Sequence, residues 1–417
     1  MTKRAVALAG GGSLGAYEVG AFEALRELGI DYDIVTGTSI GALNGAFFAT
    51  GEYDRCRKLW EDITPEGVMV QGVNISKRAL MEADSEKAVL KSFMSFLKNY
   101  VKRRGSADIT PFRHYVADAI DPVAVKNAPR KFGLVTTLLP RLSEVDLVVN
   151  DLPVDRILPY LHASSACAPV FPIEEIDGKK YIDGFYNNNL PIDFAFRLGA
   201  EEVIAIDLKL FSIKPQHSYL LSLPNVIYIA PFTSLGSMLD FSQEPIRRHM
   251  RLGYLDTMKR FGRYRGYRFT FNNADDFEAL GDEFLVNLAH ENGIYFKNCI
   301  TAITAGIQRE MRASDYLLRA TELVYEPLFS EAEQEKIWDL REFIALGRER
   351  LIAGTLNEDN KVGQRLLQVY HHAVAAPSLD SMAKIREDGF ANEITRLALH
   401  LFPLFYVRKA LPAPAST

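Results

Sequence analysis

The chain of 417 residues is poor in cysteine, with three cysteines that are widely spaced. An odd number at such spacing argues against a disulfide framework, so a reducing compartment such as the cytoplasm is expected. Long apolar runs are also missing: residues 397–407 are interrupted by His400 and Pro403 and are too short to span a bilayer. The apolar run near the N-terminus is shorter than the core of a secretory signal and fits a buried strand better.

The chain also lacks a strong excess of one charge. Its net charge is −5, with 24% charged and 48% hydrophobic residues, which is the composition of an ordinary globular protein. No overall basic character points to nucleic acid, and we expect no nucleic-acid partner. A chain of this length can hold one large domain together with a second domain or a long appendage.

Residues 34–44, IVTGTSIGALN, combine a short β-branched strand, a tight turn and an alanine-rich helix. The turn has the pattern G-x-S-x-G, in which Gly37 and Gly41 leave room for a sharp bend and Ser39 exposes its hydroxyl at the tip. A nearby helix N-terminus favours developing negative charge. Ser39 is therefore a candidate nucleophile, and an ordinary helix N-cap is the structural alternative.

Residues 4–15, RAVALAGGGSLG, predict a buried strand followed by a glycine loop. The loop lacks the Lys-Ser/Thr ending of a phosphate-binding P-loop, and its spacing departs from a dinucleotide fingerprint. The consecutive glycines Gly10, Gly11 and Gly12 could instead direct N–H groups into an oxyanion hole, or form a simple tight turn. Because parallel strands end at one edge of a sheet, the loop and Ser39 are expected there together.

Residues 170–184 predict a β-hairpin whose centre is an Asp-Gly turn. Asp183 lies at the exit of its second strand and is followed by a glycine that permits a sharp turn. The preceding residues 163–169, ASSACAP, are small, which indicates close packing beneath a site.

Three further segments complete the organisation of the chain. Residues 64–110 show no clear strand and predict a helical insertion, in which the basic amphipathic stretch 85–104 forms a lid, a membrane-surface helix or an ordinary packed helix. The basic stretch 244–267 either contacts anionic head groups or forms an ordinary solvated helix face. Residues 275–405 read as successive helices, and the tail after them is expected to be disordered.

The motifs GGGSLG, GTSIG, ASSACAPVFP and YIDG stand in this order in the chain, and together they resemble the patatin-like phospholipase family of lipid acyl hydrolases. The resemblance covers about residues 4–265. It implies a three-layer α/β/α domain with a mostly parallel central sheet in residues 1–272, with residues 64–110 as an insertion. Residues 273–417 would then form a separate, all-helical C-terminal domain.

The resemblance also implies roles for individual residues. Ser39 is the expected nucleophile, Asp183 the base, and the glycine loop the oxyanion hole, with no cofactor and no metal. Two positions depart from the family pattern: Leu14 replaces the usual Arg or Lys, and Phe185 replaces a small residue beside Asp183. Neither departure removes a group that performs the chemistry.

A serine–aspartate pair is chemically sufficient for ester cleavage. A serine hydroxyl needs a base to accept its proton, and a desolvated carboxylate with a raised pKa can serve. Each oxyanion donor typically contributes about 3 kcal/mol. A Ser-His-Asp triad would need a histidine, yet His162, His217 and His249 occupy no recognisable catalytic setting.

The predicted function is hydrolysis of a carboxylic ester of a lipid, of the phospholipase A, lysophospholipase or esterase type. Its substrate would be reached in the cytoplasm or by peripheral contact with a membrane through the basic amphipathic helices. The first alternative is a non-catalytic lipid-binding or scaffold protein that works through its helical C-terminal domain. The second is a phosphate or nucleotide site at the glycine loop.

Overall fold

The computed structural model of the protein describes residues 2–68, 108–168, 170–210, 217–272, 277–290, 293–307, 310–353, 366–371 and 393–407. Most of the predicted insertion 64–110, including the amphipathic stretch 85–104, lies outside these residues. The C-terminal tail also lies outside them.

The chain divides into two compact units, Met1–Thr257 and Met258–Thr417. The division falls within helix α11 (Gln243–Arg260), N-terminal to the boundary at residue 272 that the sequence predicts. The first unit contains the glycine loop and Ser39.

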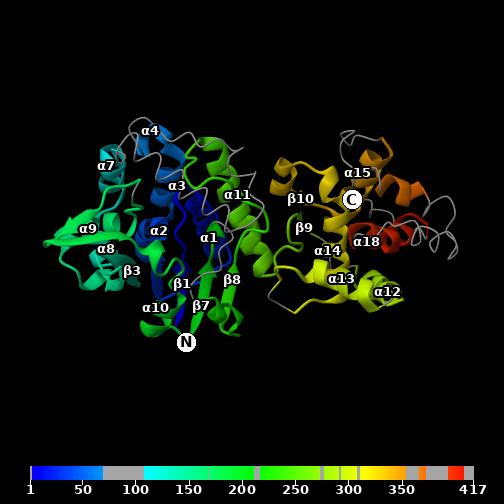
Figure 1. Ribbon diagram of the computed structural model, residues 1–417, viewed down its shortest axis with the longest axis horizontal. Coiled ribbons are helices and arrows are strands. Elements are labelled where there is room, and N and C mark those ends of the chain that lie inside the picture. Colours follow the sequence, from blue (N-terminus) through cyan, green and yellow to red (C-terminus); the bar gives the residue numbers. More distant parts are fainter. Residues whose placement is uncertain are drawn as a thin grey trace. The chain divides into compact units, whose positions relative to one another are not determined.

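The first unit is built on an eight-stranded sheet of order β5-β6-β3-β2-β1-β7-β8, with β4 paired to β3. Figure 1 labels β3, β1, β7 and β8 of this sheet. The strands are β1 (Arg4–Leu8), β2 (Ile34–Thr38), β3 (Lys131–Leu138), β4 (Ser143–Val148), β5 (Glu174–Ile176), β6 (Lys179–Asp183), β7 (Glu202–Ile206) and β8 (Val226–Ile229). The pairs β1–β2, β2–β3, β1–β7 and β7–β8 are parallel. The sheet is therefore mostly parallel, as predicted, with an antiparallel margin formed by β4, β5 and β6.

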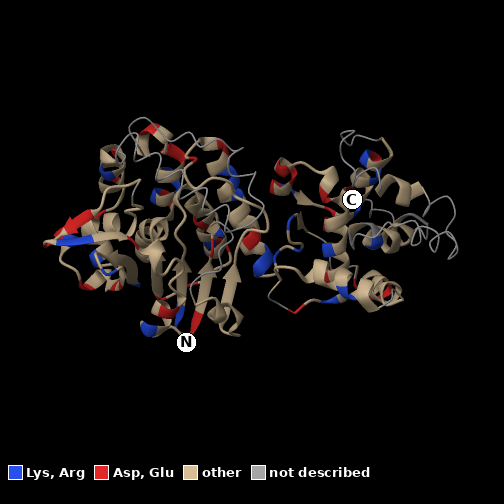
Figure 2. Ribbon diagram, viewed as in Figure 1, with Lys and Arg blue, Asp and Glu red and all other residues tan. Residues whose placement is uncertain are grey.

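The central strands are apolar because both of their faces are covered. Beyond the first residue, β1, β2 and β7 are buried along their length. Figure 2 shows that these strands carry no charged residues except at the amino ends of β1 and β7, where Arg4 pairs with Glu202. These runs of buried apolar residues are the signal from which the strands could be predicted.

Helices cover both faces of the sheet. A Cβ added to Gly45 of helix α2 (Ile40–Thr50) would lie 2.8 Å from the Phe132 ring, so α2 packs on that face of β3. A Cβ added to Gly133 would lie 2.5 Å from Phe194 of helix α10 (Ile192–Arg197). Phe132 and Gly133 are neighbours in β3 and therefore point to opposite faces of the sheet, so α2 and α10 cover opposite faces. The unit therefore has the three layers that the sequence predicts.

The remaining helices of the first unit surround these layers. They are α1 (Ala16–Glu27), α3 (Tyr53–Asp62), α4 (Pro65–Val68), α7 (Thr110–Ala119), α8 (Pro122–Lys126), α9 (Val154–Ser164) and most of α11.

The basic stretch at 244–267 is helical as far as the end of α11, and the part within the first unit crosses α1 closely. A Cβ on Gly20 would lie 1.8 Å from the Met250 carbonyl oxygen, and one on Gly253 would lie 1.9 Å from that of Tyr17. The Tyr17 hydroxyl also donates to Asp256 at 2.8 Å. This face of α11 is thus committed to packing within its own unit.

The second unit is helical around an aromatic core. Its described helices include α12 (Glu278–Leu288), α13 (Gly293–Thr304), α14 (Ala313–Tyr325), α15 (Leu340–Ile352) and α18 (Glu393–Phe402). Phe343 contacts Phe269, Phe329 and Trp338 at the centre. One addition to the predicted helices is a short parallel ladder between β9 (Thr270–Phe271) and β10 (Ile337–Trp338).

Across the described parts of both units, no helix is at once long enough and apolar enough to cross a membrane.

Candidate active site

Ser39 lies at a strained turn between β2 and α2. Its φ of 57° and ψ of −125° place a non-glycine residue in a conformation that side chains rarely adopt. A Cβ on Gly37 would lie 2.2 Å from the Gly41 carbonyl oxygen, and one on Gly41 would lie 2.6 Å from that of Ala9. The turn therefore requires glycine at both flanking positions.

Ser164, at the end of α9, holds this turn in place. Its Oγ accepts a hydrogen bond from the Ser39 N–H at 2.9 Å and donates to the Val135 carbonyl at 2.7 Å. Ser164 is fully buried, so loss of these bonds would leave polar backbone groups unsatisfied. One hydroxyl thus links the strained residue to the neighbouring strand β3.

Strand register brings Ser39 and Asp183 together. Because β4 pairs with one edge of β3 from Gly133 to Leu138, β2 and β6 must share the other edge. Along that edge β2 runs to Thr38, opposite Val135, and the antiparallel β6 runs to Asp183, opposite Thr136. The two strands therefore end facing each other.

The Ser39 Oγ donates to the Asp183 Oδ2 at 2.7 Å. The other carboxylate oxygen, Oδ1, accepts from the Phe185 N–H at 2.8 Å. This second donor is a backbone group that any residue other than proline would supply at 185. The Phe185 side chain packs edge-on against Tyr186 and is not among the residues that line the cavity beside Ser39.

Burial governs the charge state of Asp183, whose exposed fraction is 2%. Desolvation raises the pKa of its carboxyl group to about 7, although the hydrogen bonds from Phe185 and Ser39 act in the opposite direction. A carboxylate with a pKa near 7 is a much better proton acceptor than an exposed one. The pair therefore has the protonation chemistry that a serine nucleophile needs at neutral pH.

The histidines take no part in this hydrogen-bonded pair. Within the described residues, no hydrogen bond joins a histidine to Ser39 or Asp183. The His249 Nε2 lies 2.6 Å from the Leu235 carbonyl oxygen, and His162 packs edge-on against Phe112. Burial lowers the pKa of both imidazoles to about 4. His217 lies against Tyr219.

The glycine loop meets Ser39 at the same edge of the sheet. The Gly10 N–H donates to both the side-chain and the backbone oxygen of Asn189, each at 3.1 Å. No described residue accepts a hydrogen bond from the N–H of Gly11, Gly12 or Ile40. Gly12, with φ of +57°, lines the cavity with Ser39 and Ile40. Two of these residues, Gly12 and Ile40, thus lie at the wall of the cavity beside Ser39.

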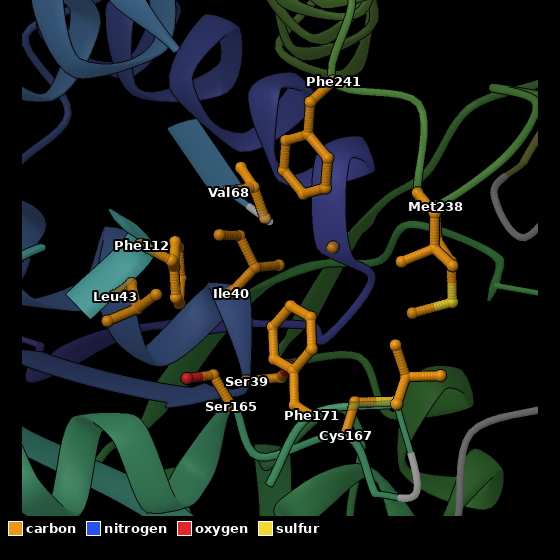
Figure 3. Close-up of a pocket in the computed structure, with 13 residues that line it drawn as sticks. Ser39, Ile40, Leu43, Val68, Phe112, Ser165, Cys167, Phe171, Met238 and Phe241 are labelled. Carbon is orange, nitrogen blue, oxygen red and sulfur yellow. The ribbon is translucent and has the colours of Figure 1, made fainter. Parts of the chain in front are cut away.

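An apolar cavity that is partly open to solvent lies beside Ser39. Figure 3 shows the Ser39 side chain among large apolar groups. The lining residues carry no charge and are Gly12, Ser39, Ile40, Leu43, Val68, Phe112, Ser165, Cys167, Val170, Phe171, Met238, Leu239 and Phe241. Such walls suit a hydrocarbon chain far better than a charged group.

The structure adds two residues to those chosen from the sequence. The sequence places Ser164 among the small residues near the site, but no local pattern indicates its contact with the Ser39 N–H. Asn189 has only a weak signal in the sequence, the run of asparagines at 187–189 shortly after Asp183, because asparagine side chains often bond to backbone groups.

Fold and site together define the first unit as a three-layer α/β domain with a strained serine and a buried aspartate at the carboxyl edge of its sheet. This unit carries a patatin-like phospholipase domain, because residues 6–196 match the family model Patatin-like phospholipase. The resemblance found in the sequence motifs is thereby confirmed.

Curated proteins match the same part of the chain. Patatin-like phospholipase domain-containing protein 7 of Rattus norvegicus is 31% identical over 211 residues, covering 49% of this chain and 13% of the rat protein. Neuropathy target esterase sws of Drosophila melanogaster is 26% identical over 204 residues, covering 48% of this chain and 12% of that protein. The chain thus spans only about an eighth of the length of these relatives.

A solved structure, VipD from Legionella pneumophila, aligns over 99% of this chain and 92% of that chain. The TM-score is 0.40 and the sequence identity 14%. A similarity at this level does not bear on function.

The raised pKa of Asp183 predicts a pH-dependent effect of Asp183→Asn on stability. The unfolded carboxyl group ionises near its ordinary pKa of 3.8 but the folded one near 7, so its contribution to stability is lost as the pH rises through this interval. Asparagine avoids that loss. We therefore expect the free energy of unfolding of Asp183→Asn, measured relative to wild type, to be higher at pH 8 than at pH 5 by on the order of 2 kcal/mol.

Thermal unfolding at the two pH values measures this gain, which corresponds to roughly 5 °C in the midpoint. Asp151→Asn, at an exposed carboxylate, is the matched control and should show no such gain. An equal difference between wild type and Asp183→Asn at both pH values would contradict a raised pKa.

Proposed function

We propose that the protein is a lipid acyl hydrolase that cleaves carboxylic esters through a Ser39 acyl-enzyme, with Asp183 as general base. The observation that carries this proposal is the 2.7 Å hydrogen bond from Ser39 to a buried Asp183 beside an apolar cavity. The patatin-like phospholipase domain and the names of its relatives support the same class of reaction.

In the first half of the proposed reaction, the Ser39 Oγ attacks the ester carbonyl carbon as its proton passes to the Asp183 Oδ2. The carbonyl electron pair moves to oxygen and gives a tetrahedral oxyanion. When this intermediate collapses, the bond to the alcohol breaks, and the alcohol leaves with the proton held by Asp183. The acyl group remains on Ser39.

In the second half, water attacks the acyl carbon and gives its proton to Asp183. A second oxyanion forms and collapses, releasing the carboxylic acid and returning the proton to the Ser39 Oγ. One carboxylate thus serves both half-reactions. Its pKa near 7 suits this exchange, because a base of low pKa would hold the serine proton too weakly.

The oxyanion would be stabilised by backbone donors of the glycine loop and the elbow. Sequence reasoning assigns this role to Gly10, Gly11 and Gly12. The Gly10 N–H donates to Asn189. We therefore propose that the oxyanion-hole donors are the N–H groups of Gly11 and Gly12, together with the Ile40 N–H at the start of α2. Fixed N–H groups need no reorganisation during the reaction, which is why such donors are effective.

The proposed substrate is an ester whose acyl chain is hydrocarbon, as in a phospholipid, lysophospholipid or simpler acyl ester. The cavity beside Ser39 has no charged lining residue, so an acyl chain is its natural occupant. Peripheral contact with a membrane through the basic stretches stays a prediction.

Fatty-acid release from a panel of lipid esters tests the proposal directly. Wild type should release fatty acid from at least one ester class, and Ser39→Ala or Asp183→Asn should lower that rate by roughly 1,000-fold or more, because nucleophile and base act as a unit. Mass spectrometry of the released acids is the measurement. Binding of lipid without turnover by wild type would favour the non-catalytic alternative.

Alanine at His162, His217 or His249 is the control series for the base. These variants should retain most of the activity per folded molecule, since none of the histidines is bonded to the Ser39–Asp183 pair. A folded histidine variant with no activity would show that the reaction uses a triad instead.

The pH profile of kcat/KM should report the ionisation of Asp183. The base must be unprotonated, so kcat/KM is expected to rise about tenfold per pH unit below an apparent pKa near 7 and to level off above it. An uncharged p-nitrophenyl ester is a suitable substrate. A rise centred near pH 4 would instead indicate a buried imidazole such as His162 or His249 as the base.

A further inference from the structure

The asparagine strap, which we define as residues 187–189, crosses the carboxyl ends of the strands that carry the site. The Asn187 Nδ2 donates to the Thr137 Oγ1 on β3 at 2.8 Å. The Asn188 carbonyl accepts from the Thr38 Oγ1 at the end of β2 at 2.7 Å. Asn189 reaches the loop that follows β1. The strap therefore joins the parts of the chain that supply the base, the nucleophile and the glycine loop.

Asn189 holds Gly10 on both sides of its backbone. The Gly10 N–H is shared between the Oδ1 and the carbonyl oxygen of Asn189, and the Asn189 Nδ2 donates to the Gly10 carbonyl at 3.1 Å. The amide thus imitates the paired donor and acceptor of a neighbouring strand. The fit is tight, because a Cβ on Gly10 would lie 2.4 Å from the Asn189 Oδ1 and 3.0 Å from the Ser39 Cβ.

This contact fixes the residue that precedes the remaining N–H donors of the glycine loop. With the N–H of Gly10 committed to Asn189, the N–H groups of Gly11 and Gly12 follow without a partner among the described residues. Asn189 therefore anchors the loop at the residue just before the free donors. A rotation of the Gly10 peptide would displace these donors.

We propose that Asn189 is the positioning residue of the oxyanion hole: its side-chain amide fixes the Gly10 peptide so that the Gly11 and Gly12 N–H groups meet the oxyanion. The inference rests on the proposed function. It assigns Asn189 no contact with substrate. Its effect is transmitted through the glycine loop alone.

Asn189→Ala tests the proposal in the full chain, and Asn150→Ala is the matched control. Asn150 also bonds to backbone groups on both sides, accepting from the Phe132 N–H at 2.7 Å and donating to the Arg130 carbonyl at 3.3 Å. These bonds lie at the amino end of β3, whereas the site lies at the carboxyl end. The two variants therefore lose similar bonds at opposite ends of the strands.

We expect Asn189→Ala to lower kcat by about 10- to 100-fold with KM within about twofold of wild type, because misplaced donors weaken transition-state binding more than substrate binding. The affinity for an alkyl trifluoromethyl ketone should fall by a similar factor, since Ser39 adds to its carbonyl and forms an oxyanion. Asn150→Ala should keep the wild-type kcat per folded molecule. Unchanged kcat in Asn189→Ala, or an equal loss in both variants, would overturn the proposal.

Asn189→Asp is the second test of the proposal, to be used if the alanine variant fails to fold. It keeps an acceptor for the Gly10 N–H but lacks the donor for the Gly10 carbonyl, so a comparable loss of kcat is expected. Wild-type kcat in Asn189→Asp would overturn the proposal.

Amide hydrogen exchange in the glycine-loop peptide provides a readout that needs no turnover. Exchange should be faster in Asn189→Ala than in wild type and unchanged in Asn150→Ala. An inactive wild type would contradict the proposed function. Hydrogen exchange would then still test whether Asn189 holds the glycine loop, because it does not depend on activity. Unchanged exchange in Asn189→Ala overturns the proposal whether or not the enzyme is active.

Discussion

The site depends on the single edge of β3 that β2 and β6 share. The parallel β2 and the antiparallel β6 end opposite Val135 and Thr136, so their last residues face each other across a short gap. The hydrogen bond between Ser39 and Asp183 closes this gap at 2.7 Å. A shift of either strand by one residue would turn its side chains to the other face and separate the pair.

This arrangement has an energetic cost that the surrounding structure must offset. Ser39 has a strained backbone, and Asp183 is a carboxyl group with almost no access to water. Buried strands and the bonds made by Ser164 and the Phe185 N–H hold both residues in position. Strain and burial of this kind are typical of sites where the conformation and the pKa of a group matter for its chemistry.

The sequence was informative where a local pattern carries the signal. The apolar strands, the glycine loop, the elbow around Ser39 and the Asp-Gly hairpin that ends at Asp183 could all be predicted, because each has its own spacing of glycine and apolar residues. The order of the motifs then indicated the family. The predicted three layers followed from the resemblance to that family.

What could not be predicted depends on contacts between distant segments. No local pattern shows that β6 meets the end of β2, that Ser164 accepts the Ser39 N–H, or that Asn189 engages Gly10. The short ladder of β9 and β10 was missed because two residues give no periodicity. Residues that hold a site are harder to find than those that perform its chemistry, since their partners are backbone groups far away in the sequence.

We infer that Ser39 is a nucleophile activated by Asp183. Covalent labelling with a fluorophosphonate at pH 8, followed by mass spectrometry of the peptide that contains residue 39, tests this inference. We expect one phosphonyl adduct on Ser39, none in Ser39→Ala, and much slower labelling in Asp183→Asn. Folded wild-type protein that remains unlabelled at Ser39, or is labelled equally fast without the Asp183 carboxylate, would contradict it.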